Sequence, residues 1–261
     1  MSDCLKIETD ARGVAVMTLN RPDKHNALSA DLMDALTAAA HALGADREVR
    51  VVVLTGAGGS FCAGGDLAWM QAQMAKGPAE RDAAARKLAE MLYALNSLPK
   101  PLIGRVQGQA FGGGIGMMAV CDVAVGVRGP MFGLTETRLG LIPATIGPYV
   151  TARMGEAMAR RVYMSGRLFE AEEAVALGLL AKAVVPETLD EAIEAEVVPY
   201  LSCAPGAVAA AKAQLRGLGP RIDAEVIDRS IAQLSERWAS DEAQEGIAAF
   251  FEKRRPRWGL G

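Results

Sequence analysis

The stretch GQAFGGGIGMMAVCD, residues 108–122, places three consecutive glycines, Gly112 to Gly114, before an apolar run with no acidic residue until Asp122. The first N–H groups of a helix have no partner within it, and they lie at the positive end of its dipole. Glycine lets another group approach that backbone closely. The stretch therefore predicts a buried helix whose first turn faces a negatively charged oxygen.

Strands flank this helix on both sides. The runs VRVVVLTG (49–56), KPLIGRVQG (100–108) and DVAVGV (122–127) are typical of strands buried on both faces of a sheet. Helices are expected at 30–44, with Ser29 as the N-cap, and at 78–97. This alternation predicts an α/β fold with a mostly parallel sheet covered by helices.

The two ends of the chain follow other patterns. Residues 4–9 and 14–19 alternate apolar and polar side chains around a turn, which predicts a β-hairpin. Beyond residue 190 the pattern is helical only, and residues 221–239 form an amphipathic segment. No linker or low-complexity segment separates this helical end, so we expect it to pack on the core or on another subunit.

A second glycine-rich loop, AGGSFCAGGDL (57–67), has the same layout: a strand, bare backbone, then a helix. Two such loops side by side would direct two N–H groups at one oxygen, an arrangement known as an oxyanion hole. Tight packing of helix on sheet is the alternative reason for the glycines. Phosphate binding is disfavoured because neither loop has the spacing G-x-G-x-x-G or a following Lys-Ser/Thr pair.

Composition excludes several classes of function. The 261-residue chain is 51% apolar and carries a net charge of −3, without the basic surface that nucleic-acid binding requires. The N-terminus does not resemble a signal peptide, and no window has the roughly 18 apolar residues of a membrane helix. We therefore expect a cytoplasmic protein with reduced cysteines. Two histidines and no Cys-x-x-Cys pair predict no metal site.

Read together, the motifs resemble the enoyl-CoA hydratase/isomerase (crotonase) family, and some variants are similar to its 3-methylglutaconyl-CoA hydratase-like branch. They occur in the family's order over nearly the whole chain: LNRPDKHNALS, VVVLTGAGGSFCAGGDL, GQAFGGGIGMMAVCD, FGLTETRLGLIPATIGP and AFFEKRRPRW. The resemblance implies a spiral of ββα repeats with the acyl-CoA site over residues 1–195. It also implies a helical oligomerisation region over 196–261 that completes the CoA site, in a homotrimer or homohexamer.

The resemblance also implies roles for particular residues. The backbone N–H groups of Gly65 and Gly113 match the family's two donors to the thioester enolate, and Glu136 matches an acid/base that exchanges the α-proton. The substrate is an acyl-CoA thioester, so no separate cofactor is expected. The positions that match CoA-binding residues are Lys24, Ala27, Ala63, Asp66, Leu67, Phe250 and Lys253.

One position departs from the family pattern. Well-known hydratases of the family carry a second glutamate, in GGGxE, where this chain has Gly116. Glu136 is left as the single acid/base, and burial beside apolar groups is expected to raise its pKa towards neutrality. The alternative is that Glu136 forms a structural ion pair, for instance with Arg138.

Three functions remain open from the sequence. The first is hydration of a 2-enoyl-CoA, or the reverse dehydration, on a branched acidic acyl chain whose distal carboxylate Arg138 holds. The second is isomerisation of a 3-enoyl-CoA to the 2-enoyl form, for which one glutamate suffices. The third is binding of acyl-CoA without catalysis. We prefer hydration, because the branch resemblance outweighs the count of carboxylates.

Overall fold

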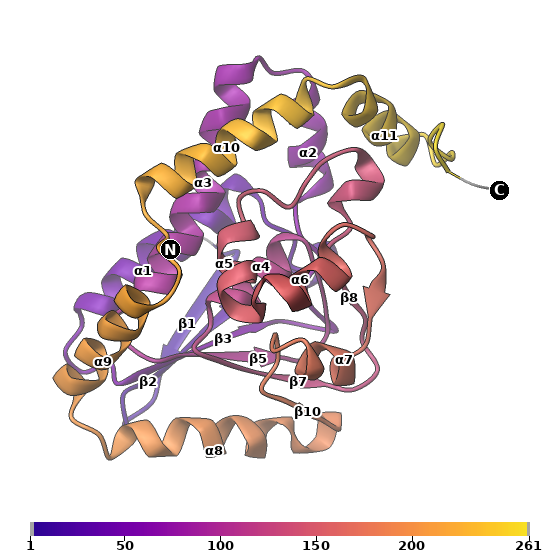
Figure 1. The fold of residues 1–261 in the computed structure, drawn as a ribbon. Helices are drawn as coiled ribbons and strands as arrows, with labels where there is room; N and C mark the ends of the chain where they lie inside the picture. Colours follow the sequence, from indigo (N-terminus) through magenta and orange to yellow (C-terminus); the bar gives the residue numbers. More distant parts are fainter. Residues whose placement is uncertain (1–2, 260–261) are drawn as a thin grey trace.

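The computed structural model describes residues 3–259 and is built on two sheets (Figure 1). The main sheet has six strands in the order β1-β2-β3-β5-β7-β10, and only the β1–β2 hairpin is antiparallel. The expected hairpin and mostly parallel sheet are confirmed. Its strands are β1 (Leu5–Thr9), β2 (Val14–Leu19), β3 (Val51–Gly56), β5 (Leu102–Val106), β7 (Val123–Val127) and β10 (Lys182–Val184).

A second sheet of four short strands accounts for the spiral, in the order β4-β6-β8-β9. Each of β3, β5 and β7 is followed by a short strand in this sheet and then by helix, so each repeat adds one strand to both sheets. This is the ββα spiral of the crotonase-like fold. The short strands are β4 (Ser60–Cys62), β6 (Gln109–Phe111), β8 (Phe132–Gly133) and β9 (Leu168–Phe169).

The structure corrects one detail of the sequence interpretation. Residues 57–67 were expected to be a loop, but they contain β4, which pairs in parallel with β6. A strand of three residues is too short for an alternating pattern to stand out. The pairing holds the two glycine-rich segments next to each other, because β4 leads into the first and β6 into the second.

Helices cover the sheets, and several begin where the sequence predicts. Ser29 caps α1, with its hydroxyl accepting from the Leu32 amide at 3.3 Å. The helices are α1 (Ala30–Ala45), α2 (Leu67–Met74), α3 (Pro78–Ser97), α4 (Gly113–Val120), α5 (Gly147–Met154), α6 (Glu156–Tyr163), α7 (Ala171–Ala176), α8 (Leu189–Leu201), α9 (Pro205–Leu218), α10 (Ala224–Trp238) and α11 (Asp241–Phe251), with short 3-10 turns η1 (Pro22–Lys24), η2 (Glu136–Leu139) and η3 (Pro186–Thr188).

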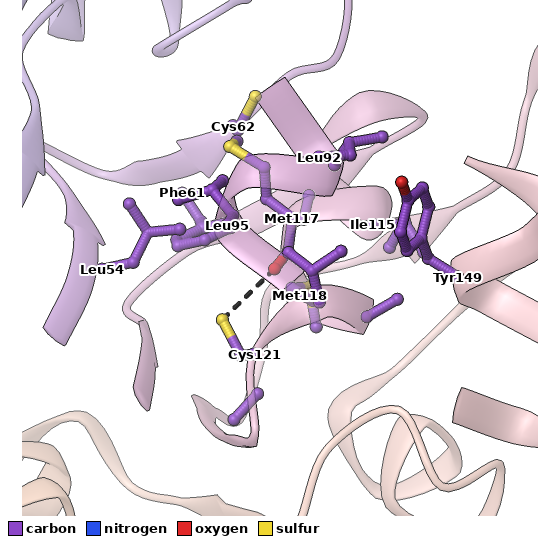
Figure 2. Packing of buried hydrophobic residues seen from close by; sticks show 14 of the residues in the cluster. Leu54, Phe61, Cys62, Leu92, Leu95, Ile115, Met117, Met118, Cys121 and Tyr149 are labelled. Carbon is purple, nitrogen blue, oxygen red and sulfur yellow. Dashed lines mark hydrogen bonds between the residues drawn. The ribbon is translucent and has the colours of Figure 1, made fainter. Parts of the chain in front are cut away.

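Helix α4 lies at the centre of the core, and every one of its residues is buried. Met117 and Met118 pack among apolar side chains of α3 and the sheets (Figure 2). Cys121, at the end of α4, is buried and its thiol donates to Met117 O at 3.2 Å. The helix is therefore held on all sides, which fixes the position of its first turn.

Asp122 joins the centre of the fold to its helical end. Its carboxylate accepts from the Leu102 amide and from Lys212 Nζ, each at 2.7 Å. Leu102 begins β5 and Lys212 belongs to α9, so one carboxylate connects a central strand to a C-terminal helix. The Asp122 carboxylate thus acts as a brace at the junction of helix and strand.

The C-terminal helices wrap around the core rather than forming a separate layer (Figure 1). Helix α8 covers one face of the main sheet through Leu189, Ile193 and Val197. Helix α10 crosses α3, and α11 packs against the η2 segment. The expected division between residues 195 and 196 falls inside α8, and a separate oligomerisation region stays a prediction.

Candidate active site

A cavity of about 520 Å³ opens between the two glycine-rich loops and the helices that cover them. Its walls come from the segment after β4, the start of α4, η2, and helices α2, α3, α10 and α11. Gly65, Gly113 and Glu136 all line it. The structure thus brings together the three residues for which the sequence predicted a catalytic role.

Two residues that line this cavity have backbone amides without a hydrogen-bond partner in the described structure. Within residues 3–259, neither the Gly65 nor the Gly113 N–H donates a hydrogen bond. Gly113 is the first residue of α4, where helical N–H groups are free by geometry. Leu28 holds the other loop, because its amide donates to Gly64 O at 2.7 Å and its carbonyl accepts from the Asp66 amide at 3.0 Å. The two amides are therefore fixed before any ligand binds.

Each glycine of the triplet has its own structural reason. Gly112 has φ +48°, and a Cβ there would lie 3.0 Å from Glu136 Oε1. At Gly114 a Cβ would lie 2.4 Å from the Cys62 carbonyl oxygen. At Gly113 it would meet Leu28 Cδ1 at 2.6 Å. A side chain at Gly113 would therefore meet Leu28, and the expected close approach of a ligand oxygen to this backbone stays a prediction.

Glu136 carries the reactive side chain of the cavity. Its Oε2 is buried and has no hydrogen-bond partner in the described structure. Burial raises the pKa of Glu136 to about 7 from the ordinary 4.5, although a hydrogen bond from its own amide acts in the opposite direction. The alternative of an ion pair with Arg138 is wrong, because no such pair forms between these described residues. The carboxyl group is thus available in both protonation states near neutral pH.

The position of the absent second glutamate is filled by apolar atoms. A Cβ on Gly116 would lie 2.6 Å from Ile146 Cγ2 and 3.5 Å from Leu92 Cδ2. A longer side chain there would have to displace Ile146. Among residues 3–259, Glu136 is the only carboxylate that lines the cavity. The cavity wall is therefore built for one carboxylate.

Five of the seven residues matched to CoA binding either line the cavity or are exposed outside its lining. Ala63, Leu67 and Phe250 line the cavity, and the last two are about half exposed. Lys24, at the end of η1, and Lys253, after α11, are exposed and lie outside the cavity lining. Contacts of these five residues with CoA stay a prediction.

Ala27 and Asp66 have structural partners in the chain itself. Ala27 is buried and its carbonyl accepts from Arg21 Nη1 at 2.6 Å. Asp66 caps α2, accepting from the amides of Ala68 and Trp69, and pairs with Arg21 Nη2 at 2.8 Å. Burial acts to raise the pKa of Asp66, but the bonds from Arg21 and the helix amides lower it overall. The Asp66 carboxylate is therefore committed to holding the loop that contains Gly65.

Several lining residues were not singled out from the sequence. Arg138 lines the cavity as expected, but its side chain is exposed. Arg81, Gln73 and Trp238 line it as well, and Arg81 Nε and Gln73 Oε1 are buried without hydrogen-bond partners. The local sequence around these residues does not indicate a place in the cavity, because the helices that bring them together meet only in the folded chain.

Comparison with known proteins decides the family. The family model described as enoyl-CoA hydratase/isomerase matches residues 9–260. The chain belongs to the enoyl-CoA hydratase/isomerase family. Among the members, a putative enoyl-CoA hydratase of Thermus thermophilus is 34% identical over 254 residues, which cover 97% of this chain and 100% of that protein. A probable enoyl-CoA hydratase of Rhizobium meliloti is 35% identical and covers 97% of this chain and 96% of its own.

Solved structures of family members share the whole fold. The crystal structure of a putative enoyl-CoA hydratase from Mycobacterium avium paratuberculosis superimposes with a TM-score of 0.87 at 32% identity, over 98% of this chain and 99% of that one. An enoyl-CoA hydratase structure from Shewanella pealeana gives 0.80 at 35% identity, over 98% and 96%. Within the described residues, no helix is long and apolar enough to span a membrane, and no His, Cys, Asp and Glu cluster suits a metal ion.

Proposed function

We propose that this family member hydrates a 2-enoyl-CoA thioester and catalyses the reverse dehydration. The observation that carries the proposal is the buried, unpaired Glu136 Oε2 in the same cavity as the free amides of Gly65 and Gly113. Hydration needs a proton carrier and donors for an oxygen that becomes negative. The names of the relatives support the same reaction.

The bonds of the reaction can be written with one carboxylate. The thioester oxygen accepts from the Gly65 and Gly113 amides. A water oxygen bonds to the β-carbon while the water gives a proton to Glu136, and the electrons of the C=C bond move onto the thioester oxygen. The enolate then re-forms its carbonyl as the α-carbon takes the proton from Glu136. One water is added, and the carboxylate is regenerated.

The raised pKa of Glu136 suits both halves of this sequence. The carboxylate form receives the proton, and the acid form delivers it; a pKa of about 7 keeps neither step steeply uphill at neutral pH. Because the resting enzyme must start with the carboxylate, kcat/KM for hydration should rise as pH increases through about 7. CoA is part of the substrate, and the reaction uses no further cofactor.

Isomerisation of a 3-enoyl-CoA is the second candidate, favoured by the single carboxylate of the cavity. Glu136 would take a proton from the α-carbon, leave a dienolate held by the two amides, and return the proton to the γ-carbon. No water is added. This route uses the same residues, so the product and not the geometry distinguishes it from hydration.

Outside the reacting centre, we propose that Lys24 and Lys253 pair with CoA phosphates and that Phe250, Leu67 and Ala63 contact the pantetheine arm. Charge supports the first part, since exposed ammonium groups suit phosphate oxygens. The chain would act as a homotrimer or homohexamer, in which exposed α9 side chains, Leu215 and Leu218 among them, give apolar surface for a neighbour.

An ultraviolet assay of the conjugated thioester tests the proposal on the wild type and on Glu136→Gln, with Glu156→Gln as a control. Glu156 is an exposed glutamate that pairs with Arg160 outside the cavity. Loss of absorbance from a 2-enoyl-CoA, with a product heavier by one water, is expected for wild type and control only. A gain of absorbance from a 3-enoyl-CoA alone would make the protein an isomerase. Binding of thioesters without either change would leave the non-catalytic alternative.

A further inference from the structure

Arg81 is a cation without an anionic partner in the wall of the cavity. It lies on α3, its Nε is buried and makes no hydrogen bond, and it forms no ion pair with any residue in 3–259. Its Cζ lies 5.9 Å from the ring centroid of Trp238 on α10. A guanidinium left partly desolvated is unfavourable unless a partner compensates it. An anion in the cavity would be such a partner.

Gln73 adds a second polar atom to the same cavity. The residue is only 2% exposed, and its Nε2 donates to Trp69 O at 3.2 Å. That bond fixes the amide orientation, so the unpaired atom is Oε1, an acceptor. The cavity lining is mostly apolar and includes Ala84, Leu88 and Leu234. Two unpaired polar atoms in this setting point to a polar ligand group.

We propose that Arg81 binds a carboxylate at the distal end of the acyl chain, so that the preferred substrate is the monothioester of a dicarboxylic acid. A water that donates to both the carboxylate and Gln73 Oε1 would satisfy the amide. The inference rests on the proposed hydration of enoyl-CoA and names its substrate class. It replaces Arg138 in this role, because the Arg138 side chain is exposed whereas Arg81 Nε is buried.

The charge of the cavity supports a carboxylate over a neutral group. The charged side chains that line it, among the described residues, are Arg81, Arg138 and Glu136. With the pKa of Glu136 near 7, the lining stays net positive at neutral pH. A phosphate of CoA is the other anion that could reach Arg81. The two sources can be distinguished, because every CoA thioester carries the phosphates whereas only a thioester of a dicarboxylic acid carries the distal carboxylate.

Calorimetric binding of saturated thioesters separates these possibilities without requiring turnover. Glutaryl-CoA and valeryl-CoA have acyl chains of equal carbon number, and only the first ends in a carboxylate. They are measured on wild type, Arg81→Gln, Arg81→Lys and Arg86→Gln. Arg86 lies on the same helix but outside the cavity, exposed and paired with Asp228, and serves as the matched control.

Wild type and Arg86→Gln should bind glutaryl-CoA about tenfold or more tightly than valeryl-CoA, as expected for a charged hydrogen bond. Arg81→Gln should abolish the preference, and Arg81→Lys should keep part of it. Equal weakening of both thioesters by Arg81→Gln would assign Arg81 to CoA and overturn the inference, as would no preference in the wild type. Failure of the proposed hydration would appear separately, as unchanged absorbance with enoyl-CoA thioesters.

Discussion

The cavity has two walls of different origin. One wall, with Gly65, Gly113 and Glu136, is made of turns that follow short strands. Each of these residues belongs to a contiguous sequence motif. The other wall, with Arg81 and Trp238, is made where α3 and α10 cross, and we call it the helical wall. The first wall holds groups suited to the reaction common to the family. The second holds Arg81, to which we assign the distal end of the acyl chain, so our proposals place reaction and selectivity on different segments of the fold.

A large loss of turnover is expected from removing one amide of the first wall. Proline is tolerated at the first position of a helix but has no N–H, so Gly113→Pro deletes the donor and keeps α4. Leu28→Ala makes room for the new side chain, since a Cβ at Gly113 would otherwise lie 2.6 Å from Leu28 Cδ1. Relative to Leu28→Ala/Gly113→Ala, kcat should fall about 10²- to 10³-fold in Leu28→Ala/Gly113→Pro. Equal kcat values would show that the Gly113 amide is not a donor to the reacting oxygen.

Glu136 should reduce the stability of the protein while serving its reaction. Its pKa is about 7 when folded and 4.5 ordinarily, so between these pH values the unfolded chain loses a proton that the folded chain keeps. The free energy of unfolding therefore falls as pH rises from 4.5 to 7 and levels off above. Glu136→Gln removes this dependence and should be more stable than wild type by up to about 3 kcal/mol at pH above 7.

Urea unfolding of both proteins across this pH range measures the effect. The two stability curves should converge below pH 4.5 and separate as pH rises to 7. A difference that stays constant with pH would mean that Glu136 is not buried as an unpaired carboxyl group.

The position at which well-known hydratases of the family carry a second glutamate is tested at Gly116. An added methyl group would lie 2.6 Å from Ile146 Cγ2, so Gly116→Ala should lower the free energy of unfolding by about 1–2 kcal/mol despite the better helix propensity of alanine. The same substitution should cost less in an Ile146→Ala background, because the crowding atom is gone. A double-mutant cycle from urea unfolding measures the coupling. Additive effects would show that Ile146 does not fill the position of the second glutamate.

The smallest effect is expected on the helical wall, at the ring beside Arg81. Trp238→Leu removes a cation–π contact at 5.9 Å and should reduce the preference for glutaryl-CoA over valeryl-CoA about threefold. Trp258→Leu makes the same change at an exposed ring outside the cavity and should leave the preference unchanged. An identical ratio in both variants would separate Trp238 from selectivity and weaken the distinction between the walls.

The same division explains what the sequence could predict. The long strands and the α1 cap at Ser29 follow from local patterns and are found as expected. The resemblance implied Gly65, Gly113 and Glu136, and the structure brings them into one cavity. The short strand β4 was missed because three residues carry too little periodicity. The contact between Gly113 and Leu28 could not be predicted, because it joins segments distant in sequence.

The polar atoms of the helical wall lay beyond sequence reasoning for a similar cause. An arginine near the start of a helix ordinarily projects into solvent, and nothing adjacent to Arg81 indicates that α10 will cover it. Its partner ring follows 157 positions later, which the sequence numbers alone show. Unpaired atoms such as Arg81 Nε become visible only when every hydrogen bond of the folded chain is accounted for.

The most direct test of the central claim, that one carboxylate takes the proton from water and delivers it to the α-carbon, is hydration of a 2-enoyl-CoA in deuterated water. Loss of absorbance and deuterium at the α-carbon are followed together for wild type, Glu136→Gln and Glu136→Asp. Glu136→Gln should lose both by about 10²- to 10⁴-fold, and Glu136→Asp should retain part of both. Hydration by Glu136→Gln within tenfold of wild type would contradict the account, because a second group would then be carrying the proton.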